Sequence, residues 1–122
     1  MDKQTELDNL RLAALEFAVE RDWEQFHSPK NLAMALAGEA AELMEHFQWL
    51  STEQSEREHL ADTTYEEIRQ EMADVLLYLL RLSERLDVDL SEAVREKLAI
   101  NAAKYPVELA KGNATKYNRR RD

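Results

Sequence analysis

Two pairs of acidic side chains are spaced so that each pair could hold a metal ion. The pairs are Glu39 with Glu42 and Glu71 with Asp74, and two residues separate the members of each pair. Successive residues of a helix turn by about 100°, so residues three apart lie on adjoining parts of one face and their carboxylates can converge. Oxygen ligands without His or Cys favour a hard ion, and we expect Mg²⁺ first and Mn²⁺ second.

Both pairs interrupt the apolar side of the segment that carries them. Glu39 lies seven residues after Leu32 and returns to within about 20° of it on a helix. Glu71 lies three residues after Ile68 and four before Val75, at a position of a heptad-like apolar seam. A carboxylate on a buried helix face is costly unless it is paired or bound to a metal. These positions therefore indicate a function for the acids.

Two simpler explanations of the acids compete with metal binding. In a chain with 25 Asp and Glu residues, most pairs at this spacing are solvated helix surfaces. Ion pairing is the second explanation, but the bases within helical reach are only His46, Arg81 and Lys97. Three bases are too few for four acids. Because both pairs lie on apolar stripes, we favour metal ligation.

A carboxylate-bridged di-iron bundle is the closest alternative metal site by spacing. Such bundles use Glu-x-x-His on two helices, together with a Glu from each of two others. Glu24 with His27 and Glu56 with His59 have this spacing. Neither pair lies on an apolar helical stripe, and the first precedes a Ser-Pro step. We therefore reject the di-iron site.

The elements that position these acids are constrained by composition. The chain has 122 residues with only two Gly, two Pro and no Cys. Many-stranded sandwiches and Gly-rich phosphate loops need more turn-forming residues than this, and sites built on thiolates are excluded. The length fits one domain. We expect an all-α fold, a four- to five-helix bundle.

The net charge of −9 argues against a nucleic-acid polymer as a partner, because duplex binding needs a basic face. No apolar run approaches the length of a membrane span, and the first residues do not resemble a signal peptide. We therefore expect a soluble, cytoplasmic protein without a membrane partner. A metal held by the carboxylates would still allow a small anion to bind.

Apolar periodicity and capping residues predict four long helices. Thr5, Ser28 and Ser91 are the expected caps of the first, second and fourth helices, and Thr63 or Thr64 that of the third. We expect one domain over residues 1–111 and a flexible basic tail over residues 112–122.

The expected helices cover residues 5–21, 29 to 49 or 50, 63–86 and 92–104. A loop over 22–28 separates the first two, and a polar stretch with a short exposed helix over 51–62 separates the second from the third. One more helical turn is expected over 107–111.

Several other side chains have types that suit a nucleotide. Trp23, Phe26, Trp49 and Tyr78 could pack at helix ends or could stack on a base, and Trp23 in a polar loop is the hardest to explain as core. On the fourth predicted helix, three side chains share one face and form either a solvated surface or a strip of donors for phosphate oxygens. These three are Lys97, Asn101 and Lys104.

Longer motifs around these residues make the chain recognisable. The motifs are Glu20-Arg-Asp-Trp-Glu-Gln-Phe-His27, Gly38-Glu-Ala-Ala-Glu-Leu43, Phe47-Gln-Trp49, Glu71-Met-Ala-Asp-Val-Leu-Leu-Tyr78, and Lys97 to Asn101 followed by Lys104-Tyr-Pro106. Over residues 7–110 the chain resembles the MazG-like all-α nucleoside triphosphate pyrophosphohydrolases, and within them the dCTP pyrophosphatase group. The resemblance implies hydrolysis between the α and β phosphates, which gives a nucleoside monophosphate and pyrophosphate.

The resemblance also implies roles for single residues. Glu39, Glu42, Glu71 and Asp74 match the acids that bind Mg²⁺ and serve catalysis. The implied substrate-binding residues are Trp23, Glu24, Gln25, Phe26, His27, Trp49 and Tyr78 at the base and sugar, and Lys97, Asn101, Lys104 and Tyr105 at the phosphates. The implied assembly is a dimer or a tetramer of dimers in which more than one chain contributes to the site.

One position departs from the resemblance. Vertebrate dCTP pyrophosphatases have a His in the first helix where this chain has Ala14. Alanine can neither hydrogen-bond to a base nor stack on it, so strict selectivity for cytosine is in question. The substrates we expect are dCTP or related dNTPs.

A non-catalytic module is the alternative from another functional class. A regulatory protein that dimerises through its helices and binds nucleotides would explain the long amphipathic segments. It would not explain acids on the apolar seam. For the enzyme, the absence of any Ser-His or Cys-His arrangement argues against a covalent intermediate. We expect one of Glu39 and Glu42 to activate a water molecule.

Overall fold

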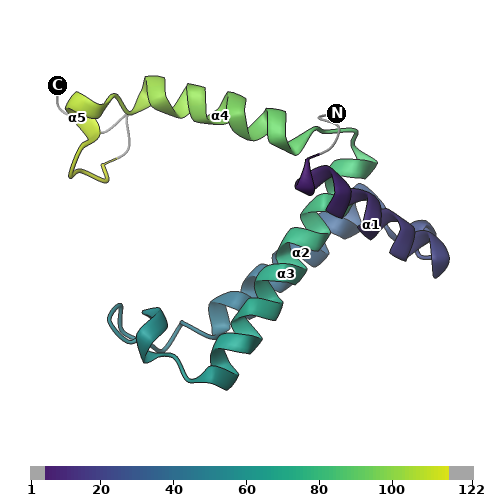
Figure 1. Ribbon diagram of the computed structural model, residues 1–122, viewed down its shortest axis with the longest axis horizontal. Coiled ribbons are helices and arrows are strands. Elements are labelled where there is room, and N and C mark those ends of the chain that lie inside the picture. The colour runs from purple at the N-terminus through teal and green to yellow at the C-terminus, as the bar shows by residue number, and fades with distance from the viewer. Residues whose placement is uncertain (1–4, 116–122) are drawn as a thin grey trace.

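The computed structural model describes residues 5–115, and in this part of the chain the regular elements are all helices, with no strand. Figure 1 shows four long helices and a short fifth one. The all-α prediction is confirmed. The elements are α1 (Glu6–Glu20), the 3₁₀ turn η1 (Glu24–Phe26), α2 (Pro29–Glu45), the 3₁₀ turn η2 (Arg57–His59), α3 (Asp62–Arg85), α4 (Leu90–Lys104) and α5 (Val107–Ala110).

The first two helices begin at the predicted caps. The Thr5 side chain accepts from the Asp8 N–H at 3.0 Å, and the Ser28 hydroxyl accepts from the Asn31 N–H at 3.1 Å. Each bond satisfies one of the N–H groups that a helix start leaves without a partner. Pro29 follows at the first helical position, where its missing N–H costs nothing.

The prediction that α2 reaches residue 49 or 50 is wrong, because the helix ends at Glu45. The His46 and Phe47 N–H groups bond to carbonyls three residues back, at 3.3 and 2.9 Å, so the last turn tightens and the α-helix stops. The apolar pattern continues through Phe47 and Leu50, and periodicity alone could not locate this end.

Two predicted caps are also wrong. α3 begins at Asp62, so Thr63 and Thr64 lie inside its first turn, and the residue at the cap position makes no side-chain bond. α4 is capped by Asp89 rather than Ser91, since the Asp89 carboxylate accepts from the Glu92 N–H at 3.1 Å. Asp and Ser are comparable caps, and only the path of the preceding turn decides between them.

The long helices α2 and α3 lie side by side and run in opposite directions, and α1 packs across α3 (Figure 1). A small set of apolar side chains is buried between these three helices. The set consists of Ala14, Ala18, Leu32, Ile68 and Leu80. This pairing places the acidic segments of α2 and α3 opposite each other.

α4 leaves this three-helix core and, with α5, extends away from the α2–α3 pair (Figure 1). Its first residues, Leu90 and Ser91, line a small cavity with Thr5 and Leu7 beside α1. Further along, Val94 and Leu98 are 54% and 62% exposed. An apolar helix surface that is this open in a single chain is typical of an interface.

Two predictions concern the ends of the chain and its relation to membranes. Residues 116–122 of the predicted basic tail lie outside the described residues, so the tail and the domain boundary at residue 111 stay predictions. Within residues 5–115, no helix combines the length and the apolar character that crossing a membrane requires.

Candidate metal and nucleotide site

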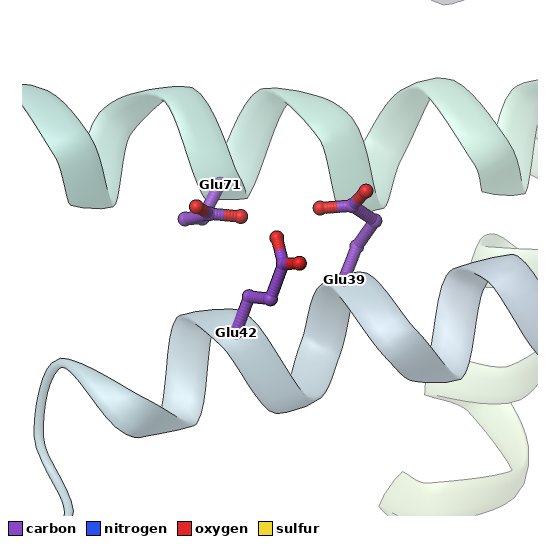
Figure 2. A group of neighbouring side chains, drawn as sticks. All are labelled: Glu39, Glu42 and Glu71. Atoms are coloured by element: carbon purple, nitrogen blue, oxygen red, sulfur yellow. The ribbon is translucent and has the colours of Figure 1, made fainter.

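Three of the four predicted acids meet between α2 and α3. Figure 2 shows Glu39 and Glu42 on α2 facing Glu71 on α3. One carboxylate oxygen from each lies within 4.8 Å of the others. Glu39 and Glu71 are half-buried, whereas Glu42 is exposed. Two α2 positions three residues apart thus oppose one α3 position.

Two oxygens of this acidic cluster, Glu39, Glu42 and Glu71, have no partner in the described part of the chain. The Oε2 atoms of Glu39 and Glu71 are buried and accept no hydrogen bond there. A buried charged oxygen without a donor is strongly unfavourable. The cluster therefore needs either a proton or a cation to be stable.

The charge state of the cluster reflects this crowding. Burial, followed by the hydrogen bond and charge of Glu42 and the charge of Asp74, raises the pKa of Glu39 from 4.5 to about 7. Burial and Glu42 also raise the pKa of Glu71. Without a cation, the cluster thus retains protons at a pH where isolated carboxylates have lost them.

The donor set fits a divalent cation with a preference for oxygen. All three side chains offer carboxylate oxygens, two of these oxygens lack any other partner, and no described His or Cys belongs to the group. Mg²⁺ and Mn²⁺ both accept such ligands. Among the predicted bases, His46 lies 3.9 Å from Glu67 and Arg81 pairs with Glu24 and Glu84, so both have acidic partners outside the cluster.

The raised pKa of Glu39 predicts how the stability of the metal-free protein changes with pH. The folded state keeps a proton that the unfolded state releases near pH 4.5, so the stabilisation is complete below that pH and is lost as the pH rises through about 7. In the presence of a chelator, we expect the melting temperature of the wild-type protein to fall between pH 5 and 8 by a greater amount than that of Glu39→Gln. If the melting temperatures of the two proteins changed equally with pH, the raised pKa of Glu39 would be contradicted.

A pocket of about 460 Å³ opens beside the acidic cluster, between α1, the 22–28 loop and α3. Glu39 and Asp74 line its acidic side. Asp74 is the fourth predicted acid. It lies outside the 4.8 Å group, but its charge raises the pKa of both Glu39 and Glu71. A ligand in this pocket could therefore reach the cluster.

The opposite side of the pocket is apolar and aromatic. Phe17 and Trp23 meet edge to face with ring centroids 5.7 Å apart, and Trp23 and His27 do so at 6.3 Å. Ala14 and Leu77 add small apolar surface, and Tyr78 also lines the pocket. Flat apolar walls with few polar groups suit a planar ring. The pocket thus joins an aromatic region to the acidic cluster.

The sequence of this part of the chain matches a known family. The model of the MazG-like family matches residues 35–119, which include both acidic pairs and all of α4. The chain belongs to the MazG-like family. The resemblance predicted from the motifs is therefore confirmed, and with it the MazG-like fold.

Known proteins support the assignment to the MazG-like family. The chain is 45% identical over 111 residues to dCTP pyrophosphatase 1 of Mus musculus and 43% identical to that of Homo sapiens. These matches cover 91% of this chain, which spans 65% of the length of either relative. A crystal structure of a pyrophosphatase from Archaeoglobus fulgidus is similar with a TM-score of 0.76 and 38% identity, over 87% of this chain and 97% of that one.

The 22–28 loop of this MazG-like chain brings only part of the predicted set to the pocket. Trp23 and His27 line it, but Glu24, Gln25 and Phe26 do not. Gln25 donates to the Asp22 carbonyl at 3.0 Å. Phe26 is 60% exposed. None of the η1 residues lines the pocket, whereas Trp23 and His27 on either side of η1 do. A list of consecutive residues could not separate these two groups.

The remaining predicted residues lie away from the pocket within one chain. Trp49 is 87% exposed in the turns after α2. The four residues predicted at the phosphates lie on α4 or directly after it, in the segment that extends away from the core (Figure 1). None of them lines the pocket. These are Lys97, Asn101, Lys104 and Tyr105.

Arg81 and Phe17 line the pocket and were not predicted as site residues. Arg81 could have been found, because it follows Asp74 and Tyr78 at i+7 and i+3 and shares their helix face. Phe17 carries no such signal. It fits the apolar stripe of α1 equally well as a core residue.

Proposed function

We propose that this chain hydrolyses dCTP or related deoxynucleoside triphosphates to the monophosphate and pyrophosphate, with Mg²⁺ as the cation and Mn²⁺ as a substitute. The observation that carries the proposal is the acidic cluster, with buried unpartnered oxygens, at the edge of a pocket with aromatic walls. The mouse and human relatives, both dCTP pyrophosphatases, are in line with it.

The acids have two tasks in this reaction. Glu39, Glu42, Glu71 and Asp74 would hold the cation, which supplies charge neutralisation for the triphosphate when bound. Glu39 or Glu42 accepts a proton from the attacking water. The water oxygen forms a bond to the α phosphorus while the bond from that phosphorus to the bridging oxygen breaks, and pyrophosphate leaves.

The experiment is a panel of the common NTPs and dNTPs assayed for pyrophosphate release with and without Mg²⁺. We expect release that depends on the cation and is fastest with dCTP or a related dNTP. Failure to release pyrophosphate from any nucleotide would overturn the proposal. If a nucleotide then still raised the melting temperature in Mg²⁺, the alternative of a non-catalytic nucleotide-binding module would replace it.

We also propose that the chain works as a homo-oligomer, a dimer or a tetramer, in which α4 of one copy supplies phosphate contacts to another. Two observations support this. The apolar residues Val94 and Leu98 on α4 are exposed, and the cations Lys97 and Lys104 on the same helix lie away from the acidic cluster of their own chain. The α4 cations would then contact phosphates only in the site of a second copy.

Trp49 tests the base-binding part of this arrangement. Since it is 87% exposed in the single chain, Trp49→Ala should leave the helices intact. Loss of base stacking should raise KM by about tenfold and change kcat less. Trp49→Phe, which keeps an aromatic face, should retain most of the affinity. Steady-state kinetics check this, and an unchanged KM in Trp49→Ala would remove Trp49 from the site.

A further inference from the structure

Arg81 is the only charged residue that is buried in the described part of the chain. Its side chain is 4% exposed, and it lines the pocket from α3. Burying a guanidinium is unfavourable unless acceptors surround it. The groups it contacts therefore indicate what it does.

Three side chains converge on the Arg81 guanidinium. Nε donates to His27 Nδ1 at 3.2 Å, and Nη1 donates to Glu84 Oε2 at 3.1 Å. Nη2 lies 3.6 Å from Glu24 Oε1 and donates no hydrogen bond within residues 5–115. Acids from α3 and η1 thus hold the guanidinium in place, and its Nε points at the imidazole of His27.

The contact with Arg81 determines which nitrogen of His27 carries a proton. A guanidinium has only donors and stays protonated in proteins, so His27 Nδ1 must accept. The neutral ring then carries its proton on Nε2, because a proton on Nδ1 would face the Arg81 donor. In agreement, burial and the charges of Arg81 and Arg85 lower the pKa of His27, against an opposing effect of Glu24.

The other nitrogen of His27 is available to a ligand. His27 lines the pocket beside Trp23, and its Nε2 makes no hydrogen bond to any residue from 5 to 115. The aromatic end of the pocket therefore contains an N–H donor of fixed direction. A histidine free to change tautomer could offer either a donor or an acceptor at that point.

We propose that Arg81 is a positioning residue that locks His27 as the Nε2–H tautomer, so that the pocket selects a base with an acceptor on the facing edge. The inference rests on the proposed function for the identity of the ligand as a nucleotide. Cytosine offers an unprotonated N3 beside its O2, whereas N3 of thymine and uracil carries a proton. A locked donor that faces position 3 bonds to N3 of cytosine and opposes the N3–H of thymine and uracil.

The protonation of the ring can be measured without turnover, by nitrogen NMR of ¹⁵N-labelled full-length protein at neutral pH. The chain has three His residues, so His27→Asn assigns the signals of His27 by their loss. We expect an unprotonated Nδ1 and a protonated Nε2 in the wild-type protein. A proton on Nδ1, or a doubly protonated ring, would overturn the proposal even if no variant of Arg81 folds.

Two variants of Arg81 form a matched pair, since both lose the charge. Arg81→Gln keeps an N–H donor at the ε position of the side chain, and Arg81→Met places a methyl group there. We expect mixed tautomers in Arg81→Met and a mostly protonated Nε2 in Arg81→Gln. The ratio of kcat/KM for dCTP to that for dTTP should fall about tenfold in Arg81→Met and much less in Arg81→Gln.

The outcomes separate this inference from the proposed function. Wild-type tautomers in Arg81→Met, or an unchanged dCTP to dTTP ratio despite mixed tautomers, would overturn the role of Arg81 and leave the pyrophosphohydrolase proposal standing. If no nucleotide is hydrolysed, the proposed function fails, and a tautomer change confined to Arg81→Met would still support the positioning role.

Discussion

Glu71→Gln is expected to abolish turnover and at the same time to raise the melting temperature of the metal-free protein. Glu71 Oε2 is buried without a partner in the described part of the chain, and burial, followed by Glu42, raises the pKa of this residue. An amide removes the charge of the carboxylate but is a poor ligand for a hard cation. We expect kcat/KM to fall by about 10³-fold or more, equivalent to about 4 kcal/mol.

Glu67→Gln is the matched control for this variant. Glu67 precedes Glu71 by one turn of α3, is 66% exposed at its side chain, and lies 3.9 Å from His46 rather than in the acidic cluster. Its replacement should leave turnover and Mg²⁺ dependence near wild-type values. Kinetics and thermal unfolding with and without Mg²⁺ measure both effects. Full activity in Glu71→Gln would contradict the metal assignment.

Two inactive variants are expected to regain activity when mixed. Glu71→Gln lacks a metal ligand, and the double variant Lys97→Ala/Lys104→Ala lacks the α4 cations, which should lower kcat/KM by about a hundredfold. If Glu71 is a metal ligand as proposed and α4 of one copy completes the site of another, a mixed dimer contains one site with neither defect. A 1:1 mixture should then recover about a quarter of wild-type activity.

The recovery depends on exchange between copies, so the two variants are unfolded and refolded together as well as mixed when folded. Co-refolded Glu71→Gln with Glu67→Gln serves as the control, because both substitutions lie on α3 and one of them leaves the site intact. That mixture should be no more active than the Glu67→Gln protein that it contains. No recovery in the mixture with the α4 variant would mean that each chain builds its site alone.

The fold class followed from composition and periodicity, and the helix starts followed in part. Thr5 and Ser28 cap their helices as predicted because local side chain to backbone bonds determine those starts. The end of α2 at Glu45 and the Asp89 cap depend on turn geometry that does not alter the apolar pattern. The direction of α4 depends on the surface that it packs against, and the apolar pattern of the α4 sequence carries little information about that surface.

The acids of the candidate site were predictable because they violate a pattern. Glu39 and Glu71 occupy apolar positions, and the structure brings both to one point with Glu42. Arg81 shares a helix face with Asp74 and Tyr78, but its partner His27 is 54 residues away in the sequence. A pairing between distant elements requires the fold. The absence of Glu24 and Gln25 from the pocket lining could not be predicted for a similar reason, since η1 is too short to show a period.

The scarcity of glycine gives the chemistry of the proposed site a physical basis. With two Gly residues in the whole chain, there is no Gly-rich loop to surround a triphosphate with backbone N–H groups. Side chains on helices have to hold a cation instead. Part of the net charge of −9 then belongs to the acidic cluster that would bind it.

Hydrolysis of dCTP in water enriched in ¹⁸O, followed by ³¹P NMR and mass spectrometry of the products, tests the central claim most directly. Attack of water at the α phosphorus, with Glu39 or Glu42 as the base, predicts dCMP that carries one ¹⁸O and pyrophosphate that carries none. Label in the pyrophosphate, or products that are dCDP and orthophosphate, would contradict the account.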